Sequence, residues 1–443
     1  MQNADTIAAI ATAPGVGGVG IIRVSGPGVA SVASRVIRKI PEDRIATFAN
    51  FRNQSGDRLD SGLALFFKGP NSFTGEDVLE LHAHGGPAVL RTVLRACFEA
   101  GARPAEPGEF SKRAFLNDKL DLAQAEAVAD LIEATTETAV ISAQRSLSGD
   151  FSSVIGLIKA ELITIRVSIE ATIDFSDEDI TAADVEAIKD RLAGVVHQLE
   201  TVLISAKTGA LLREGIRVVI AGQPNVGKSS LMNRLFEEEV SIVTDIPGTT
   251  RDVLQKELSI DGFPIHLVDT AGLRDTADPV ELIGVERAIS NAKTADLILE
   301  VRATGEEEHT NTPMLEGISD RRIIVINKID LVEGEPSVSQ GKTGPVVRLS
   351  AKTGCGLDLL KQTILSLSGA KTEGETPFMA RERHIRALES ALSCMTSAQS
   401  NLETIEFCAE DLRQAQDAIS QITGEFVSDD LLGEIFSSFC IGK

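Results

Sequence analysis

The spacing of hydrophobic positions changes along the chain. Residues 1–118 contain short apolar runs rich in β-branched residues, at 19–24, 63–67 and 78–82, between loops that contain Gly and Pro. A helix is predicted among them from Pro87 to Glu99. Strands and helices mixed in this way are typical of an α+β domain, which we place at residues 1–118.

Helical spacing dominates residues 119–210, where helix breakers nearly vanish and apolar residues recur three or four positions apart. Examples are Leu162, Ile165, Ile169 and Ile173. The same spacing returns in residues 369–443, where one helical face contains Leu412, Ala415, Ile419 and Ile422. Long helices are therefore predicted in both segments.

A last helix is predicted to begin at Ser428, because a serine N-cap is followed there by Asp429 and Asp430 in the positive first turn. Its buried stripe is predicted to be Leu431, Leu432, Ile435, Phe436 and Phe439.

Strands alternate with helices in residues 211–368, which predicts an α/β domain. Each flanking helical segment alone would expose an apolar face. We therefore expect residues 119–210 and 369–443 to pack together as one discontinuous helical domain, with the α/β domain inserted. The predicted fold class is multidomain α/β and α.

Charge and composition restrict the function. The net charge of −22 argues against strong nonspecific binding of nucleic acid, because phosphate neutralisation supplies most of that affinity. An RNA substrate would need a local basic patch or a partner. The absence of Trp and Tyr excludes base-stacking platforms of those types.

The expected location is the cytoplasm. The N-terminus has no secretory pattern, and no apolar run approaches the ~20 residues that span a bilayer. Five scattered cysteines without a Cys-x-x-Cys pair indicate reduced thiols. The acidic stretch at 174–179 is most simply a solvated link and helix start, with a metal site as the alternative.

A phosphate-binding loop is predicted at Gly222-Gln-Pro-Asn-Val-Gly-Lys228-Ser229, between a buried strand at 217–221 and a helix at 229–236. Its glycines let backbone N–H groups point at phosphates. Lys228 would neutralise the β- and γ-phosphate oxygens, and the Ser229 hydroxyl would ligate Mg²⁺.

Further motifs follow in the order of a GTPase. A strand at 264–269 delivers Asp269 to the magnesium shell, and Thr270-Ala-Gly272 turns beneath the γ-phosphate. Thr249 or Thr250, in the 245–251 segment, can close over Mg²⁺ when the γ-phosphate is present.

Guanine recognition is predicted after two later strands. Asp330, in Asn327-Lys328-Ile-Asp330, can accept from two guanine donors, whereas adenine presents a mismatched edge. A backbone N–H of Ser350-Ala351-Lys352 can meet the guanine oxygen. The ordered motifs therefore indicate GTP rather than ATP.

The residue after Gly272 is Leu273, which cannot orient the attacking water as the glutamine of Ras-like switches does. Another group must hold the water if hydrolysis is appreciable. Arg251 or Arg274 could supply a positive charge to the leaving oxygen, or either could be an exposed arginine of the switch loops.

The segment 244–252, together with Asn225, resembles potassium-activated GTPases. The chain as a whole resembles the MnmE (TrmE) family of tRNA-modification GTPases. The resemblance is carried by 5–7, 71–80, 108–126, 424–433 and the ending Phe439-Cys-Ile-Gly-Lys443.

The resemblance implies an N-terminal domain that dimerises and binds a tetrahydrofolate derivative, in the 5,10-methylene or 5-formyl form. Its folate contacts match Arg23, Glu80 and Lys119, with Lys443 reaching the same region. Gly15 to Gly20 satisfies G-x-G-x-x-G, but a strand follows it, so a dinucleotide site is not predicted.

The resemblance also implies that K⁺ replaces an arginine finger, held by Asn225 and by the loop with Thr244, Ile246 and Thr249. The water-orienting acid matches Glu281, which could otherwise be a surface glutamate of a switch helix. The residues implied to be catalytic are therefore Glu281, Lys228 and Asn225. Those implied to bind Mg²⁺ are Ser229 and Thr250. The predicted nucleotide-site residues are Asn225, Val226, Gly227, Lys228, Ser229, Ser230, Thr244, Asp245, Ile246, Pro247, Gly248, Thr249, Thr250, Asp269, Thr270, Ala271, Gly272, Asn327, Lys328, Asp330, Ser350, Ala351 and Lys352.

The family acts as a homodimer with a flavoprotein of the MnmG (GidA) type, in a heterotetramer or larger assembly. Together they add an aminomethyl-type or carboxymethylaminomethyl-type group at C5 of the tRNA wobble uridine. Small departures from the family, at Val16, Ala83 and Glu382, affect local loop contacts. Cys440 could be a nucleophile or a packed thiol.

Two alternatives remain. A ribosome-assembly GTPase of the Era/Der type would carry a basic, KH-like RNA-binding domain after the α/β domain, but residues 370–443 are acidic and lack its G-x-x-G loop. A nucleotide-dependent scaffold without useful turnover is the other.

Overall fold

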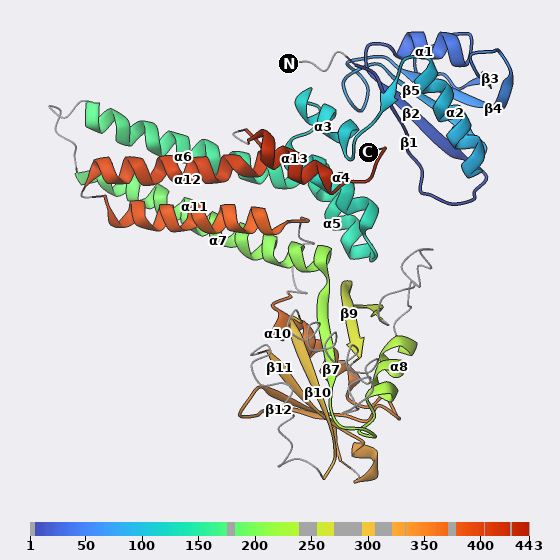
Figure 1. Cartoon of the computed structure of the whole chain (residues 1–443). Coiled ribbons are helices and arrows are strands. Elements are labelled where there is room, and N and C mark those ends of the chain that lie inside the picture. The colour runs from blue at the N-terminus through green and yellow to red at the C-terminus, as the bar shows by residue number, and fades with distance from the viewer. Residues whose placement is uncertain are drawn as a thin grey trace, which may run out of the picture. The chain divides into compact units, whose positions relative to one another are not determined.

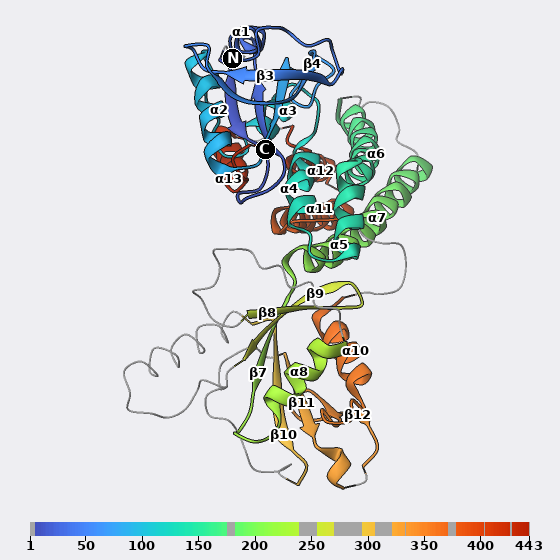
Figure 2. The same ribbon diagram turned by 90° about the vertical axis from the view of Figure 1, so that its right-hand side faces the viewer.

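The structure is a computed structural model that describes residues 5–174, 182–238, 255–269, 295–305, 321–332, 334–370, 378–402, 404–425 and 428–442 (Figure 1). The chain forms two compact units, each discontinuous in sequence. The first contains residues 1–132, 146–196 and 390–443, and the second contains residues 133–145 and 197–389. Figure 2 gives a second view of the elements within each unit.

A mixed sheet in the order β3-β4-β5-β2-β1-β6 is the centre of the N-terminal domain. Neighbouring strands pair antiparallel except β1 and β6, which are parallel. The strands are β1 (Ile7–Ile10), β2 (Gly20–Ser25), β3 (Thr47–Arg52), β4 (Arg58–Phe67), β5 (Val78–Ala83) and β6 (Arg103–Pro104). The three predicted strands correspond to β2, β4 and β5, and the α+β class is confirmed.

Side-chain alternation gives this sheet two different faces. Ile22 and Leu81 point to a core shared with α1 (Val29–Val36) and α2 (Pro87–Glu99). Because successive residues of a strand face opposite sides, Arg23 and Glu80 lie on the other face. The predicted helix from Pro87 to Glu99 is confirmed as α2.

Long helices follow, as predicted. Those outside the α/β domain are α3 (Glu109–Leu116), α4 (Leu122–Glu133), α5 (Glu137–Leu147), α6 (Asp150–Asp174), α7 (Ala182–Glu214), α11 (Glu382–Ser400), α12 (Ile405–Thr423) and α13 (Asp429–Ser437). None of the helices that the structure describes combines the length and the apolar character needed to cross a membrane.

The predicted apolar faces are mostly buried. In α12 all four predicted positions, from Leu412 to Ile422, are buried. In α6, Leu162, Ile165 and Ile169 are buried, but Ile173 is exposed one residue from the end of the helix. Helices α6 and α12 pack side by side (Figure 1).

The C-terminal segment packs on the N-terminal domain. Ser428 is the N-cap of α13, and its side chain accepts from the Leu431 N–H, as predicted. The Gly108 N–H donates to the Cys440 carbonyl (3.4 Å). At Gly442, whose φ is +99°, a Cβ would lie 2.3 Å from the Ile10 carbonyl oxygen, so the tail contacts β1 through glycine backbone.

A second sheet, in the order β12-β13-β11-β10-β7-β9-β8, forms the α/β domain. Strands β9, β7, β10, β11 and β13 are parallel, with β8 and β12 antiparallel at the edges. They are β7 (Ile216–Ala221), β8 (Gln255–Ile260), β9 (Phe263–Asp269), β10 (Leu297–Ala303), β11 (Arg322–Asn327), β12 (Ser337–Gln340) and β13 (Pro345–Arg348). The described helices here are α8 (Lys228–Glu238), α10 (Leu357–Ser368) and the 3₁₀ turn η2 (Ile329–Leu331).

Two close contacts lie within the second unit, the first between α7 and the segment before α11, the second between the start of α5 and the α/β domain. A Cβ at Gly209, in α7, would lie 2.0 Å from the Phe378 carbonyl oxygen. The Thr136 hydroxyl, at the start of α5, donates to the Gly262 carbonyl in the β8–β9 turn (2.8 Å). The division into compact units passes through α5, α7 and α11, so the predicted domain boundaries stay a proposal.

Candidate functional site

The carboxyl ends of the parallel strands meet at one edge of the second sheet, where ligands of α/β domains commonly bind. Strand β7 leads there into the loop 222–227, and α8 begins immediately afterwards at Lys228. Asn225 (φ +66°) and Gly227 (φ +98°) both have left-handed backbone conformations. A Cβ at Gly222 would lie 2.2 Å from the Val301 carbonyl oxygen, so the loop can curl only with glycine there.

Lys228 lies within this curl. Its Nζ donates to the carbonyl oxygens of Gly222 (2.8 Å) and Gln223 (2.9 Å). The ammonium is thus held in the concave side of the loop, where phosphate oxygens would replace carbonyl oxygens as acceptors. Ser229 and Ser230 are exposed in the first turn of α8, at its positive end.

Asn327, at the end of β11, connects the phosphate loop to the predicted guanine loop. Its Nδ2 donates to the Val226 carbonyl (2.9 Å), and its Oδ1 accepts from the N–H groups of Lys328 (2.8 Å) and Ala351 (2.9 Å). Asn327 is buried, and a Cβ at Gly227 would lie 2.3 Å from its Nδ2. The geometry therefore assigns Asn327 a positioning role between the two loops.

The two motifs predicted to recognise guanine lie side by side. The Ser350 hydroxyl donates to Asp330 Oδ1 (2.6 Å), which orients the exposed carboxylate and leaves Oδ2 for a base edge. Lys328 Nζ donates to the Asn225 carbonyl (2.6 Å) and so links this end of the site to the tip of the phosphate loop. Lys352 is exposed next to Ala351.

Several predicted residues of the nucleotide site lie outside the described residues. These are Thr244, Asp245, Ile246, Pro247, Gly248, Thr249, Thr250, Thr270, Ala271, Gly272 and Glu281, as well as Leu273, Arg251 and Arg274. Strand β9 ends at Asp269, as predicted. The acidic stretch 174–179 lies almost wholly outside them too, and the described residues hold no cluster of His, Cys, Asp and Glu that fits a metal ion.

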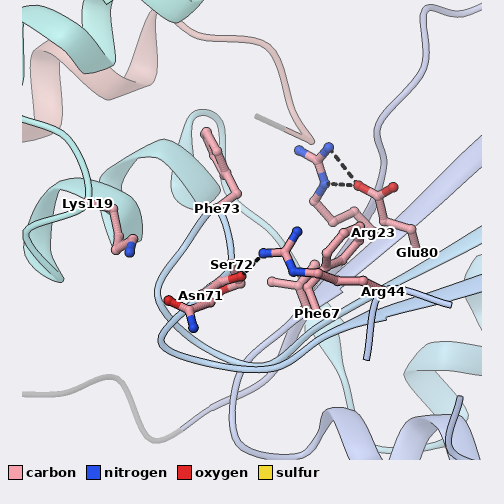
Figure 3. Close-up of a pocket in the computed structure, with 9 residues that line it drawn as sticks. Arg23, Arg44, Phe67, Asn71, Ser72, Phe73, Glu80 and Lys119 are labelled. Carbon is pink, nitrogen blue, oxygen red and sulfur yellow. Dashed lines mark hydrogen bonds and ion pairs between the residues drawn. The ribbon is translucent and has the colours of Figure 1, made fainter. Parts of the chain in front are cut away.

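A second candidate site is a cavity of about 580 Å³ in the N-terminal domain (Figure 3). Arg23, Glu80 and Lys119, which lie far apart in the sequence, all line it. Its other lining residues are Arg44, Phe67, Asn71, Ser72, Phe73 and Val78. The structure therefore brings three of the four predicted folate residues to one cavity. Lys443 lies outside the described residues, although the preceding Gly442 carbonyl lies 3.5 Å from Arg23 NH1.

Arg23 is held by charge and by aromatic rings. Its Nε and NH2 donate to Glu80 Oε1 at 3.0 and 2.9 Å, as Figure 3 shows. The guanidinium lies 5.7 Å from the Phe73 ring centroid and 5.8 Å from that of buried Phe110. The Arg23–Glu80 pair thus offers a fixed donor and acceptor set at one wall of the cavity.

Sequence reasoning missed Arg44, Phe67 and Phe73 as lining residues. Arg44 stacks on the Phe67 ring (5.5 Å) and donates to the Asn71 carbonyl. Its loop reaches β4 through a bridge between Asp43 and Phe66, which no local pattern predicts. The 71–80 motif did contain Phe73, but whether Phe73 lines the cavity depends on how that loop folds back over the sheet.

A buried ionic network supports the loop that carries Phe73. Arg113, only 2% exposed, donates to Glu109 (2.9 Å), Glu76 (3.1 Å) and Asp5 (2.8 Å). Arg103 also donates to Glu109 (2.6 Å). Burial opposes ionisation of Glu109, but hydrogen bonds from Arg103, the Glu106 N–H and Arg113 outweigh it and lower its pKa. The pKa of Asp5 is lowered in the same way by Arg103 and Arg113.

The five cysteines are unpaired. Burial raises the pKa of the Cys97 thiol to about 12 and that of Cys408 to about 11, the latter with a contribution from Asp411, so neither thiol is reactive at neutral pH. Cys440 is exposed beside Gly108, which leaves its predicted alternatives open.

Known protein families match nearly the whole chain. The family described as "GTP-binding protein TrmE N-terminus" matches residues 6–119, and the family described as "MnmE helical domain" matches residues 122–440. The chain belongs to the MnmE family. The predicted family resemblance is confirmed, and with it the fold class.

Curated MnmE proteins are similar over their full length. The tRNA modification GTPase MnmE of Hydrogenovibrio crunogenus is 52% identical over 99% of both chains. That of Azoarcus sp. is 50% identical over 99% of this chain and 98% of its own. Among solved structures, the G domain of the T. maritima FeoB iron transporter is 26% identical over 34% of this chain and 98% of its own, with a TM-score of 0.27. Membership of the MnmE family removes the Era/Der alternative.

Proposed function

We propose that this MnmE family member hydrolyses GTP and, with a flavoprotein of the MnmG type, modifies C5 of the tRNA wobble uridine with a folate one-carbon unit. The GTPase activity and the link to tRNA modification are those of the family. The flavoprotein, the folate and the form of the product, an aminomethyl or carboxymethylaminomethyl group, are our proposal.

One observation carries the GTPase assignment: the phosphate loop and the guanine-recognition loops are joined through Asn327 at one sheet edge. The loop fits a triphosphate, because Gly222 and Gly227 leave the space that a Cβ would fill and Lys228 is directed into it. At the other end, Asp330 Oδ2 would accept from guanine, whereas the adenine edge offers no matching pair of donors.

Residues of this chain would carry the hydrolysis as follows. Lys228 compensates negative charge on the β- and γ-phosphates, and Ser229, Thr250 and Asp269 hold Mg²⁺. Glu281 orients the attacking water in place of the missing glutamine. K⁺, bound by Asn225 and by Thr244, Ile246 and Thr249, would supply the positive charge that an arginine finger supplies elsewhere.

The cavity on the N-terminal sheet supports the folate part of the proposal. Its volume of about 580 Å³ lies within the usual range for small-molecule sites, and aromatic rings line it beside a few polar groups. The Arg23–Glu80 pair offers donors and an acceptor to a heterocycle, and Lys119 offers a cation to a carboxylate. Lys443 would complete the site from the C-terminal tail.

We expect GTP binding and hydrolysis to be coupled to tRNA modification through a homodimer of this chain. We propose that GTP and K⁺ bring two GTP-binding domains together across the dimer and so move the helical segments. The contact of Thr136 with Gly262 supports this route, because the β8–β9 turn joins the strands that follow and precede the nucleotide-sensing segments. Spin-label distances that do not change between GDP and a transition-state mimic in K⁺ would contradict it.

The test is GTP hydrolysis in K⁺ against Na⁺ at equal ionic strength. We expect faster turnover in K⁺, and we expect Asn225→Lys to lose that preference while GTP binding remains. Equal rates in both salts would remove the cation mechanism, and negligible turnover in either would favour a nucleotide-dependent scaffold. Wobble-uridine analysis of tRNA from cells that lack the protein tests the modification itself.

A further inference from the structure

Basic residues of the N-terminal domain fall into two groups. Arg23, Arg103 and Arg113 are each paired with a carboxylate in or below the cavity. A second group forms no ion pair with any carboxylate in the described part of the chain. Within this second group, we name the basic face the five residues that lie on or directly after α1 and on α2: Arg35, Arg38, Lys39, Arg91 and Arg95.

The basic face lies on the side of the sheet opposite the cavity. Helices α1 and α2 bury Val32 and Val93 in the core that they share with the sheet, and they contact each other (Figure 1). The opposite sides of both helices are exposed to solvent. Arg35 is on this side of α1, and Arg91 and Arg95 lie one turn apart on this side of α2.

Hydrogen bonds to the backbone fix the positions of two of these cations. Arg35 NH1 lies 3.5 Å from the carbonyl oxygen of Ala100, which caps α2. Lys39 Nζ donates to the Phe48 carbonyl (2.7 Å). Arg38 also lies against Gly56, to whose carbonyl Arg52 donates (2.8 Å). Arg35, Arg38 and Lys39 thus lie at the end of α1, and Arg35 reaches the end of α2.

Carboxylates of this surface are fewer than its cations. Glu99 lies on α2, Glu42 follows α1 in the chain, and Asp57 adjoins Gly56. Asp57 is bound to the Asn53 side-chain amide (3.0 Å) and does not pair with a cation of the basic face. Gathering cations without carboxylate partners costs free energy through their mutual repulsion, and an external polyanion would remove that cost.

The N-terminal domain differs in net charge from the rest of the chain. Residues 1–118 contain 13 Lys and Arg against 12 Asp and Glu, whereas residues 119–443 contain the other 30 against 53. The net charge is therefore +1 for the N-terminal domain and −23 for the rest. A polyanion would be repelled from most of the chain and attracted to this domain.

We propose that the basic face binds the phosphate backbone of the tRNA substrate. The proposal rests on the proposed function and names the surface that a protein of net charge −22 would offer to RNA. Contacts of this kind fix the orientation of a nucleic acid without reading its sequence. The base to be modified would then lie elsewhere.

An anionic membrane is the less favoured occupant. Peripheral helices that bind membranes insert large apolar side chains between their basic ones. On α1 and α2 themselves, the exposed positions next to the arginines are Ser31, Ser34, Ala88 and Thr92, which are small or polar. The exposed apolar side chains nearby, Ile40 and Phe48, lie outside both helices and do not alternate with the arginines. Hydroxyl and guanidinium groups match phosphate oxygens of an RNA backbone without insertion.

The test compares binding of an unmodified tRNA transcript to the full-length protein and to the triple variant R35Q/R91Q/R95Q over a salt series. At ~0.1 M salt we expect affinity to fall at least ~10-fold, and the slope of log Kd against log salt to decrease by about 2. Glu99→Gln should strengthen binding slightly. Vesicles of anionic lipid form a parallel arm, in which we expect no binding.

A matched control removes three exposed cations that are paired with carboxylates. Lys189, Lys207 and Arg413 pair with Glu186, Glu389 and Glu410, respectively. The variant K189Q/K207Q/R413Q changes the net charge by the same amount as R35Q/R91Q/R95Q does. Its tRNA affinity should equal that of the protein without substitutions. Equal losses in both triple variants, or no loss in either, would overturn the proposal, as would vesicle binding that the first variant abolishes.

GTP turnover in K⁺ separates this proposal from the proposed function. The triple variant R35Q/R91Q/R95Q should keep that turnover, because its residues lie outside the nucleotide site. If the protein hydrolyses GTP and supports wobble-uridine modification, but its tRNA affinity does not depend on the basic face, the proposed binding surface is wrong and the proposed function stands.

Discussion

The nucleotide site and the cavity of the N-terminal domain are assembled in different ways. The phosphate loop is one continuous segment between β7 and α8, and its shape depends on glycine backbone. The cavity combines side chains from β2, β4, β5, two loops and the segment before α4. Its shape depends on strand register and on the buried network around Arg113.

This difference determines how each region should respond to substitution. In the nucleotide site a side chain can be removed while the backbone keeps its curl, so chemistry should fail before folding does. In the N-terminal domain, the groups below the cavity are charged and buried, so their loss should affect folding as well as binding.

Lys228→Ala should have the largest effect. We expect GTP turnover to fall about 10³-fold, because a preorganised charge on the phosphates is lost. The N-terminal domain should keep its thermal stability and its folate affinity. Single-turnover hydrolysis with a folate-binding assay on the same preparation measures both. A loss of folate affinity would show that the two regions are not independent.

Glu109→Gln should destabilise the N-terminal domain by about 3 kcal/mol, because it leaves Arg113 buried with less compensating charge. Guanidinium chloride unfolding followed in that domain would measure the change. GTP binding by the variant is the control, and it should be unaffected. Unchanged stability would mean that the network does not hold the domain together.

The same network predicts acid sensitivity. Since the pKa values of Glu109 and Asp5 are lowered from their ordinary values of 4.5 and 3.8, their contribution is complete above those values and is lost as pH falls through the lower ones. Stability of the N-terminal domain should therefore fall below about pH 4, less steeply in Glu109→Gln. If stability falls equally steeply with pH in Glu109→Gln and in the protein without substitutions, Glu109 is not a source of the acid sensitivity.

Asp330→Asn should weaken GTP binding about 100-fold, since an acceptor for two guanine donors is lost. The amide would instead donate to a carbonyl at the same base position, so xanthosine triphosphate should bind better to the variant than to the unmodified protein. Competition binding with GTP, xanthosine triphosphate and ATP measures this. Equal losses for all three nucleotides would indicate damage to the loop rather than to base recognition.

Arg23→Gln should have the smallest effect, a loss of folate affinity of about 10-fold, because one charged donor is removed from the cavity wall. Glu80 keeps a neighbour in His82, at 3.4 Å, so the fold should tolerate the change. Isothermal titration with 5-formyltetrahydrofolate measures it, with Lys68→Gln, exposed outside the cavity lining, as control. Unchanged affinity would argue against folate at this wall.

Much of the fold could be predicted because its signals are local. Helix spacing predicted the buried face of α12, the Pro at N1 marked α2, and a serine N-cap marked the start of α13. The curl of the loop after β7 was predictable for the same reason, since Gly222, Gly227 and Lys228 lie within one short segment. The short strands β1, β3 and β6 were not predicted, because their pairing partners lie far away in the sequence.

The cavity shows where local signals end. Arg23 and Glu80 are 57 positions apart and meet only because β2 and β5 pair in one register. Only the family resemblance predicted them, whereas Arg44 depends on a loop that no motif marks. The positioning role of Asn327 was also missed, because it follows from distances between two loops rather than from residue type.

The division of the chain into two compact units has a consequence for biosynthesis. The unit that holds the N-terminal sheet also needs residues 390–443, whereas the unit that holds the phosphate loop is complete at residue 389. Domains fold as units while the ribosome still extends the chain. The nucleotide-binding half can therefore mature first, and the half that began synthesis earliest must wait for the final helices before it is whole.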